Sequence, residues 1–175
     1  MKKKTLALVL ALTLLVAGVV GGTLAWLTDQ TAEVKNTFTV GDINIGLTET
    51  TADYKMVPGN TIAKDPTVTV KANSEACWLF VQVTESADLK DFITYAIAEG
   101  WTELEAGVYY REVPASAADQ TFSVLAGDAV TVKSDVTKTM LETAKTDAPT
   151  LTFKAYAIQK DHFATADAAW AEVSK

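Results

Sequence analysis

The chain has 175 residues, 49% of them hydrophobic, and carries a net charge of −7 at pH 7 from 22 acidic and 15 basic residues. The apolar content excludes wholesale disorder, and the acidic balance argues against nucleic-acid binding, which needs clustered Lys and Arg for phosphate contacts. A single cysteine, Cys77, excludes a disulfide within the chain.

The first 25 residues have the pattern of a secretory signal peptide. A lysine run at positions 2–4 forms its positively charged start, and a largely apolar run, Leu6–Val20, follows. Thr23 and Ala25 provide the small residues that a signal peptidase reads on the N-terminal side of its cleavage site. We therefore expect cleavage after Ala25 and a mature protein that begins at Trp26.

The same stretch leaves one alternative, an uncleaved membrane anchor. The segment Thr5–Thr28 carries no charge and is long enough to span a bilayer. The Gly21-Gly22 pair and the lack of a positive cluster after the apolar run favour cleavage. Removing residues 1–25 takes away three basic residues and no acidic one, which leaves a net charge of −10. We expect a secreted protein in the extracellular matrix or at the cell surface, with no membrane segment after cleavage.

The segment Trp26–Val40 has the alternation of a β-strand. Its apolar side chains fall on even positions, at Trp26, Ala32, Val34, Phe38 and Val40, while the odd positions from Asp29 onward are polar. At 15 residues it is longer than the usual strand of about five or six. The alternation changes phase at Gly41 and continues at Ile43, Ile45 and Leu47, which predicts a bulge or corner at Gly41.

The rest of the chain reads mostly as strands. They are predicted over residues 67–71, 77–84, 92–97, 108–113, 121–125, 130–133 and 150–159. The strands 92–97 and 108–113 are expected to pair around the connection 98–107. Pro58-Gly59 predicts a turn, and Gly127-Asp128 predicts a hairpin turn between 121–125 and 130–133.

Two segments are predicted to be helical. Ser134 or Asp135 is expected to cap a short helix, and a second helix is expected near the C-terminus. The apolar faces of the two helices are Val136, Met140, Leu141 and Ala144, and Phe163, Ala166, Trp170 and Val173. About eight short strands with one or two peripheral helices predict an all-β fold, a jelly-roll-like β-sandwich, as one domain over residues 26–175.

Cys77 opens an apolar run whose odd positions are uniformly hydrophobic and whose even positions turn polar at Gln82. An odd cysteine in a secreted protein suggests pairing between chains. Its place on the predicted core face instead favours a buried, free thiol that packs as a small hydrophobic residue.

Several short motifs resemble the TasA/camelysin family of Gram-positive bacteria. They are GGTLAWLTD at 21–29, NTFTVG at 36–41, INI at 43–45, VPGN at 57–60 and KD at 64–65. The resemblance covers residues 1–83. It implies export through a dedicated SipW-type signal peptidase, a jelly-roll sandwich, and fibres of the biofilm matrix whose subunits donate the mature N-terminal strand to a neighbour.

Strand donation needs an extended segment with one apolar face and an open sheet edge to receive it. On this hypothesis the donor strand is 26–40, its anchors are Trp26, Val34, Phe38 and Val40, and the partner is a second copy of the chain. Other matrix or cell-wall components are further possible partners. The alternative is that 26–40 is the ordinary first strand of its own sandwich, because pairing within and between chains uses the same backbone groups.

An enzymatic reading, a camelysin-like cell-surface metalloprotease, needs a zinc site. Hydrolytic zinc takes three protein ligands, often paired histidines, and this chain has only His162, which we expect in an exposed strand-to-helix loop. Further acidic residues, considered for acid–base chemistry or weak calcium binding, have no supporting motif; they are Glu103, Glu105, Asp161, Asp167 and Glu172. We expect no enzymatic activity, metal or cofactor.

A third reading is a non-polymerising cell-surface binding module. Trp101, Tyr109, Tyr110 and Trp170 could line a groove for a glycan or a peptide. We expect instead that these rings cover the edges of the core, because aromatic side chains contribute the most buried area per residue. Two or more exposed rings on one face would favour the binding module.

Overall fold

The computed structural model describes residues 42–50 and 54–175, which form ten β-strands in three antiparallel sheets with a few short helices. The predicted all-β class is therefore confirmed. Several predictions fall outside the described residues: the cleavage site at Thr23 and Ala25, the strand 26–40 with all four of its anchors, and the corner at Gly41.

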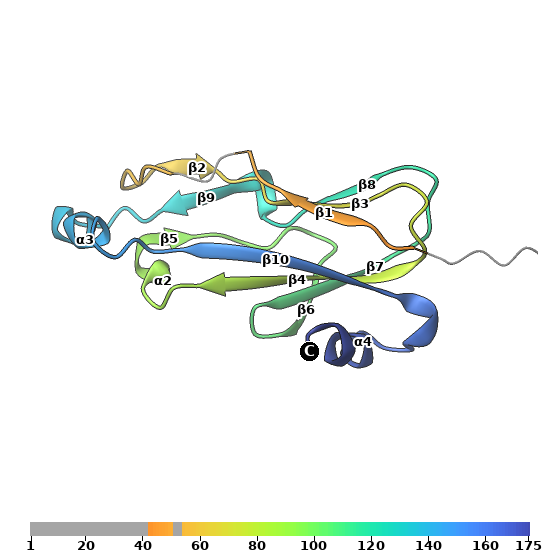
Figure 1. The fold of residues 1–175 in the computed structure, drawn as a ribbon. Coiled ribbons are helices and arrows are strands. Elements are labelled where there is room, and N and C mark those ends of the chain that lie inside the picture. The colour runs from red at the N-terminus through yellow and green to blue at the C-terminus, as the bar shows by residue number, and fades with distance from the viewer. Residues whose placement is uncertain (1–41, 51–53) are drawn as a thin grey trace, which may run out of the picture. The chain divides into compact units, whose positions relative to one another are not determined.

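The two larger sheets pack face to face, with β1, β3 and β8 lying over the four-stranded sheet (Figure 1). The first sheet has the order β1 (Ile45–Thr48), β3 (Thr67–Val70), β8 (Gln120–Ser123). The second has the order β10 (Leu151–Gln159), β4 (Cys77–Glu85), β7 (Val108–Val113), β6 (Thr102–Glu105). The third consists of β2 (Thr61–Ala63), β9 (Ala129–Val132) and β5 (Ile93–Thr94).

Short helical segments lie at the periphery, as predicted. They are α2 (Leu89–Phe92), η1 (Ala126–Asp128), α3 (Lys138–Ala144), η2 (Lys160–His162) and α4 (Ala166–Val173). The predicted cap of α3, Ser134 or Asp135, is wrong, because the Oγ1 of Thr137 accepts the hydrogen bond from the backbone N–H of Met140 at 3.3 Å. Thr165 caps α4 in the same way.

Strand β4 is buried on both faces because two different elements cover it. Its odd-numbered residues, such as Leu79 and Val81, join the core between the two larger sheets. Its even-numbered Trp78 and Phe80 face α4, which packs on the outer face of the four-stranded sheet (Figure 1). Cys77 is fully buried and free, as expected from its position on the core face.

The two predicted turns have different outcomes. Pro58-Gly59 forms a turn in which the N–H of Asn60 donates to the carbonyl of Val57 at 3.0 Å, and Gly59 supplies the positive φ of 80°. The predicted hairpin at Gly127-Asp128 is wrong: the chain does turn there, but β8 pairs with β3 and β9 pairs with β2 and β5. The turn carries the chain from one sheet into another.

The region 92–113 also differs from the prediction. The segment 92–97 does not pair with β7; it contains the end of α2 and the two-residue strand β5, which pairs with β9. The true partner of β7 is β6, a polar strand that the apolar pattern missed. Leu104 is half-buried and the other three residues of β6 are exposed, so this edge strand has no apolar face that a pattern could reveal.

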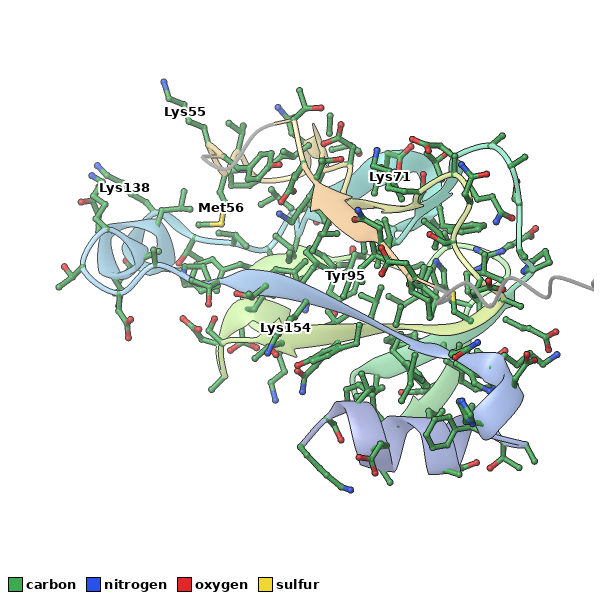
Figure 2. The ribbon with its side chains drawn as sticks, turned by 45° about the vertical axis from the view of Figure 1, so that its right-hand side comes forward. Lys55, Met56, Lys71, Tyr95, Lys138 and Lys154 are labelled. Atoms are coloured by element: carbon green, nitrogen blue, oxygen red, sulfur yellow. The ribbon has the colours of Figure 1, made fainter. Side chains whose placement is uncertain are left out.

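Besides the cluster under α4, two further apolar clusters make up the interior around these sheets. One lies between the two larger sheets and the other lies among β5, β9, α2 and α3. Four half-buried residues pack against both clusters: Tyr95, Ile97, Leu151 and Phe153. Tyr95, labelled in Figure 2, donates its hydroxyl proton to Oε1 of Glu85, and burial is the largest cause that raises its pKa.

Candidate functional site

Among residues 42–50 and 54–175, strand β10 has β4 as its only strand partner, so within this part of the chain its other side is a free sheet edge. Two hydrogen bonds at its ends show which residues of β10 bond to β4. The N–H of Ser86 donates to the carbonyl of Thr150, and the N–H of Lys160 donates to the carbonyl of Ala76. Even-numbered residues bond to β4, and the odd-numbered ones turn their backbone N–H and C=O groups away from it. The nine residues of β10 therefore offer a strand-length row of backbone groups to a further strand.

Strand β1 has a free edge of the same kind. The N–H of Lys71 donates to the carbonyl of Asn44 at 2.8 Å, which makes the even-numbered residues of β1 the ones bonded to β3. The N–H and C=O groups of Ile45 and Leu47 consequently point away from β3. Strands β1 and β10 approach each other, yet within the described residues no backbone hydrogen bond joins them. We call these two free sides, Ile45–Thr48 and Leu151–Gln159, the open edge.

Apolar side chains along the open edge are incompletely covered. Leu47 is on the core-facing side of β1, opposite the fully buried Val68, but its exposed fraction is 36%. The core-facing residues next to the edge on both strands are only half-buried: Ile43, Ile45, Phe153, Ala155 and Ala157. The core is thus thinner along the open edge than in its centre, where residues such as Leu79 and Val81 are fully buried.

A pocket of about 420 Å³ lies where β10 begins. Its apolar wall includes Met56, Ile62, Val130 and Leu151, and the side chain of Lys64 lines it as well. The pocket extends the open edge toward β2 and β9. Its volume is large enough for an aromatic side chain such as an indole ring.

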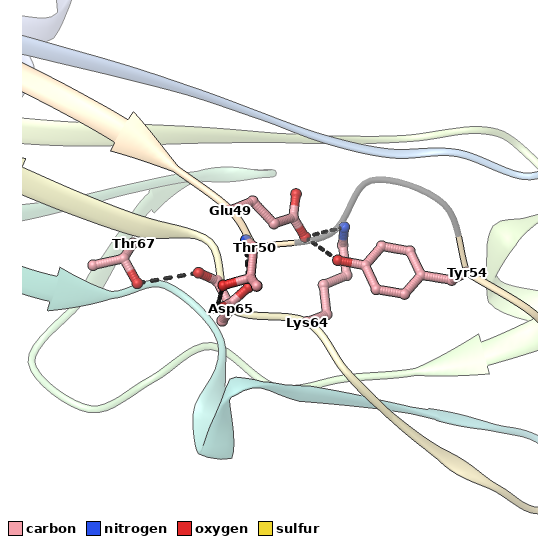
Figure 3. Close-up of polar contacts among 6 residues, drawn as sticks. All are labelled: Glu49, Thr50, Tyr54, Lys64, Asp65 and Thr67. Carbon is pink, nitrogen blue, oxygen red and sulfur yellow. Dashed lines mark hydrogen bonds and ion pairs between the residues drawn. The ribbon is translucent and has the colours of Figure 1, made fainter.

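The lysine in this pocket is held in a network of polar and aromatic groups (Figure 3). The side chain of Lys64 is 9% exposed, and its Nζ lies 2.6 Å from Oε1 of Glu49. The hydroxyl of Tyr54 donates to the same Oε1 at 2.8 Å, and the Nζ lies 4.7 Å from the Tyr54 ring centroid and 5.4 Å from that of Phe153. Burial, followed by the hydrogen bond to Glu49, raises the pKa of Tyr54.

The neighbouring Asp65 fastens the end of β1 to the start of β3 (Figure 3). Its Oδ1 accepts a 2.9 Å bond from the N–H of Thr50, and its Oδ2 accepts a bond from the Thr50 hydroxyl. These hydrogen bonds lower the pKa of Asp65. Lys64 and Asp65 together therefore place the chain after β1 beside the pocket.

The residues considered for metal binding do not come together. His162 lies exposed in η2, the segment between β10 and α4, as expected. Within residues 42–50 and 54–175 no group of three or more His, Cys, Asp or Glu side chains is arranged to hold a metal ion. Glu105 belongs to strand β6 rather than to a loop, and its Oε1 accepts a hydrogen bond from the indole of Trp170.

The aromatic residues considered for a binding groove lie on two different sides of the four-stranded sheet. Trp101 and Tyr109 pack against the core between the sheets, whereas Tyr110 and Trp170 pack under α4. None of the four is fully exposed. They cover the edges of the core, as expected.

Sequence reasoning missed both strands of the open edge as binding elements, and also Lys64, Glu49 and Tyr54. Pairing partners are set by the topology, so no local pattern could have shown that β1 and β10 each have a single neighbour among the strands that the structure describes. A lysine between Ala63 and Asp65 gives no sign of burial. The only available signal was the motif KD at 64–65.

Within the described part of the chain no helix is long and apolar enough to cross a membrane. Comparisons with protein-family models, with curated proteins and with solved structures found no match to this chain.

Proposed function

We propose that the protein is a secreted, non-enzymatic structural subunit of extracellular fibres, in which residues 26–40 of one copy add as a strand to the open edge of the next. The observation that carries this proposal is the open edge itself, where β1 and β10 each have one side without a partner strand among the described residues, and where the core residues are half-covered. A strand added there would complete a jelly-roll-like sandwich. The resemblance of residues 1–83 to the TasA/camelysin family supports the same assignment.

The dimensions of donor and acceptor agree. The nine residues of β10 span about 30 Å, and the donor anchors Val34, Phe38 and Val40 cover about 20 Å of an extended chain. Their side chains would cover Phe153 and its half-buried neighbours on the core side of the edge. The large ring of Trp26 suits the pocket at the start of β10. Signal-peptide removal after Ala25 would free the donor for this exchange.

Assembly of the mature protein tests the donor. We expect residues 26–175 to form fibres visible by negative-stain electron microscopy, and a variant lacking 26–40 to remain monomeric in analytical ultracentrifugation. A synthetic peptide of residues 26–40 added in excess should block assembly of the mature protein. If the truncated protein forms fibres as well as the mature one does, the segment is not the connector.

A matched pair of surface variants tests the acceptor. Leu47 at the open edge and Val57 near the Pro58-Gly59 turn are the large hydrophobic residues that are exposed in the described part of the chain, with exposed fractions of 36% and 49%. Because Leu47 is on the core-facing side of β1, circular dichroism first checks that Leu47→Lys folds as well as Val57→Lys does. We expect Leu47→Lys to slow fibre growth at least tenfold and Val57→Lys to leave it unchanged. Equal growth of both variants would place the acceptor elsewhere.

A further inference from the structure

The chain contains one arginine, Arg111, on the core-facing side of β7 opposite Leu79. Arg111 lies away from the open edge. One strand, β4, separates β7 from β10 in the four-stranded sheet, and one strand, β3, separates β8 from β1 in the other sheet. The side chain is half-buried between aromatic rings: its Cζ lies 3.9 Å from the ring centroid of Phe122 and 5.3 Å from that of Trp101. Such stacking fixes the plane of a guanidinium group.

The rings that hold the guanidinium are themselves fixed. Trp101 donates its Nε1–H to the carbonyl of Ser123 at 2.9 Å, which ties the segment before β6 to β8. Phe122 is on β8 and packs against the central core. The arginine is therefore held by two elements, and its orientation does not depend on a flexible loop.

Arg111 has no partner for its charge. Within residues 42–50 and 54–175 it makes no ion pair and donates no hydrogen bond, and its Nε is buried without an acceptor. The acidic Glu112 next to it pairs with Lys160 instead. Burial lowers the pKa of Arg111, and no carboxylate of the described residues compensates for the lost hydration. Although the chain has 22 acidic residues, none of those that the structure describes pairs with its one arginine.

Gly100 lets the backbone approach the guanidinium closely. A Cβ atom at this position would lie 3.0 Å from Nη2 of Arg111, and the φ of Gly100 is 84°, which disfavours any other residue. The Nη1 and Nη2 atoms form the end of the side chain, a planar fork whose N–H groups can donate hydrogen bonds to two oxygens of one group.

We propose that Arg111, with Trp101 and Phe122 as its stacking walls, is a binding site for an oxyanion, a carboxylate or a phosphate group carried by another molecule. The group binds end-on to the N–H donors of Nη1 and Nη2. The rings exclude water from both faces of the guanidinium, which strengthens these charge-assisted bonds relative to those of an exposed lysine.

A nuclear magnetic resonance titration tests the site, because the only arginine gives a single side-chain Nε–H signal in ¹⁵N-labelled mature protein. The probes are inorganic phosphate and acetate, each against sodium chloride at the same ionic strength. We expect the Arg111 signal to shift along a saturating curve with at least one of the two oxyanions and not with chloride. Tighter binding of phosphate or of acetate identifies which of the two groups the site prefers. No saturating shift with either overturns the proposal.

Two variants serve as controls, and binding to each is followed through the indole Nε1–H signal of Trp101. Arg111→Lys keeps the charge but removes the fork, and we expect binding to weaken at least tenfold. Lys154, labelled in Figure 2, is an exposed cation that also lies on an aromatic ring, with its Nζ 4.7 Å from the ring centroid of Tyr156. Lys154→Gln should bind like the wild type. Unchanged binding by Arg111→Lys would show that general charge attracts the anion.

Discussion

The indole Nε1 of Trp170 lies 2.7 Å from Oε1 of Glu105 and donates a hydrogen bond that joins helix α4 to strand β6. The same indole packs on Phe80, with ring centroids 5.3 Å apart, and makes an edge contact with Tyr156 at 5.2 Å. Trp170 thus connects α4 to three strands of the four-stranded sheet, although the helix has only eight residues.

Two substitutions of Trp170 should destabilise the fold by different amounts. Trp170→Phe loses the hydrogen bond and part of the buried area, and we expect a cost of about 1–2 kcal/mol in the free energy of unfolding. Trp170→Ala leaves a cavity and should cost about 3–5 kcal/mol. Urea unfolding followed by circular dichroism measures both. Glu105→Gln keeps an acceptor and should cost less than Trp170→Phe; equal stability of Trp170→Phe and wild type would contradict the role of the bond.

Removing one partner of the buried pair of Lys64 and Glu49 should destabilise the fold more than removing both. Glu49→Gln leaves the ammonium of Lys64 buried without its counter-charge, and we expect a loss of about 2–3 kcal/mol. Adding Lys64→Met to this variant removes the uncompensated charge and should restore most of the loss. The exposed pair of Glu142 and Lys145 is the control, where Glu142→Gln should change stability by less than about 1 kcal/mol. Equal effects of the two glutamate variants in urea unfolding would argue against a buried pair.

The thiol of Cys77 should react slowly in the folded protein. Burial raises the pKa of its thiol to about 11, so the reactive thiolate at pH 8 is about a hundredfold rarer than for an ordinary cysteine. We expect native protein to react with a disulfide reagent such as DTNB more than a hundredfold more slowly than protein in urea. We also expect non-reducing gels to show no dimer. Rapid labelling of the native protein would mean that the strand start at Cys77 opens.

Acid should weaken the link between β3 and β8. The N–H of Ala72 and the side chain of Lys71 donate to Asp119, and these bonds lower its pKa below the ordinary value near 4. A lowered pKa stabilises the fold above the unfolded-state value, and this contribution is lost as the pH falls through the folded-state value. Below about pH 4, wild-type stability should therefore fall more steeply than that of Asp119→Asn.

Unfolding midpoints measured across this acid range test the expectation. Asp161→Asn is the control, because Asp161 forms no hydrogen bond or ion pair within the described residues. Its variant should follow the wild-type pH profile. If Asp119→Asn follows that profile too, the bonds from Lys71 and Ala72 do not persist in solution.

Local patterns predicted the elements whose environment is uniform along their length. Strand β4 was found because its odd positions are all apolar, and α4 because its apolar residues repeat at helical spacing. The wrong hairpin at Gly127-Asp128 has a different origin, since a turn dipeptide fixes where the chain reverses and leaves open which strands pair. Strand β6 was missed because pairing, and not burial, holds it in place.

The candidate site was harder to predict than the fold for the same reason. An open edge is a property of strand order, which depends on contacts between residues far apart in the sequence. The charge partner of Lys64 and the stacking rings of Arg111 also come from other segments of the chain. The segment 26–40 could be proposed as a donor from the sequence because its alternation of apolar and polar residues is local.

The four residues shared by the two apolar clusters have a thermodynamic consequence. Tyr95, Ile97, Leu151 and Phe153 belong to the surroundings of both clusters, so neither interior can be exposed to water while the other stays intact. Melting should consequently appear in a scanning calorimeter as one peak whose calorimetric and van't Hoff enthalpies agree. The molecule would then have no partly melted intermediate from which its sheets could aggregate.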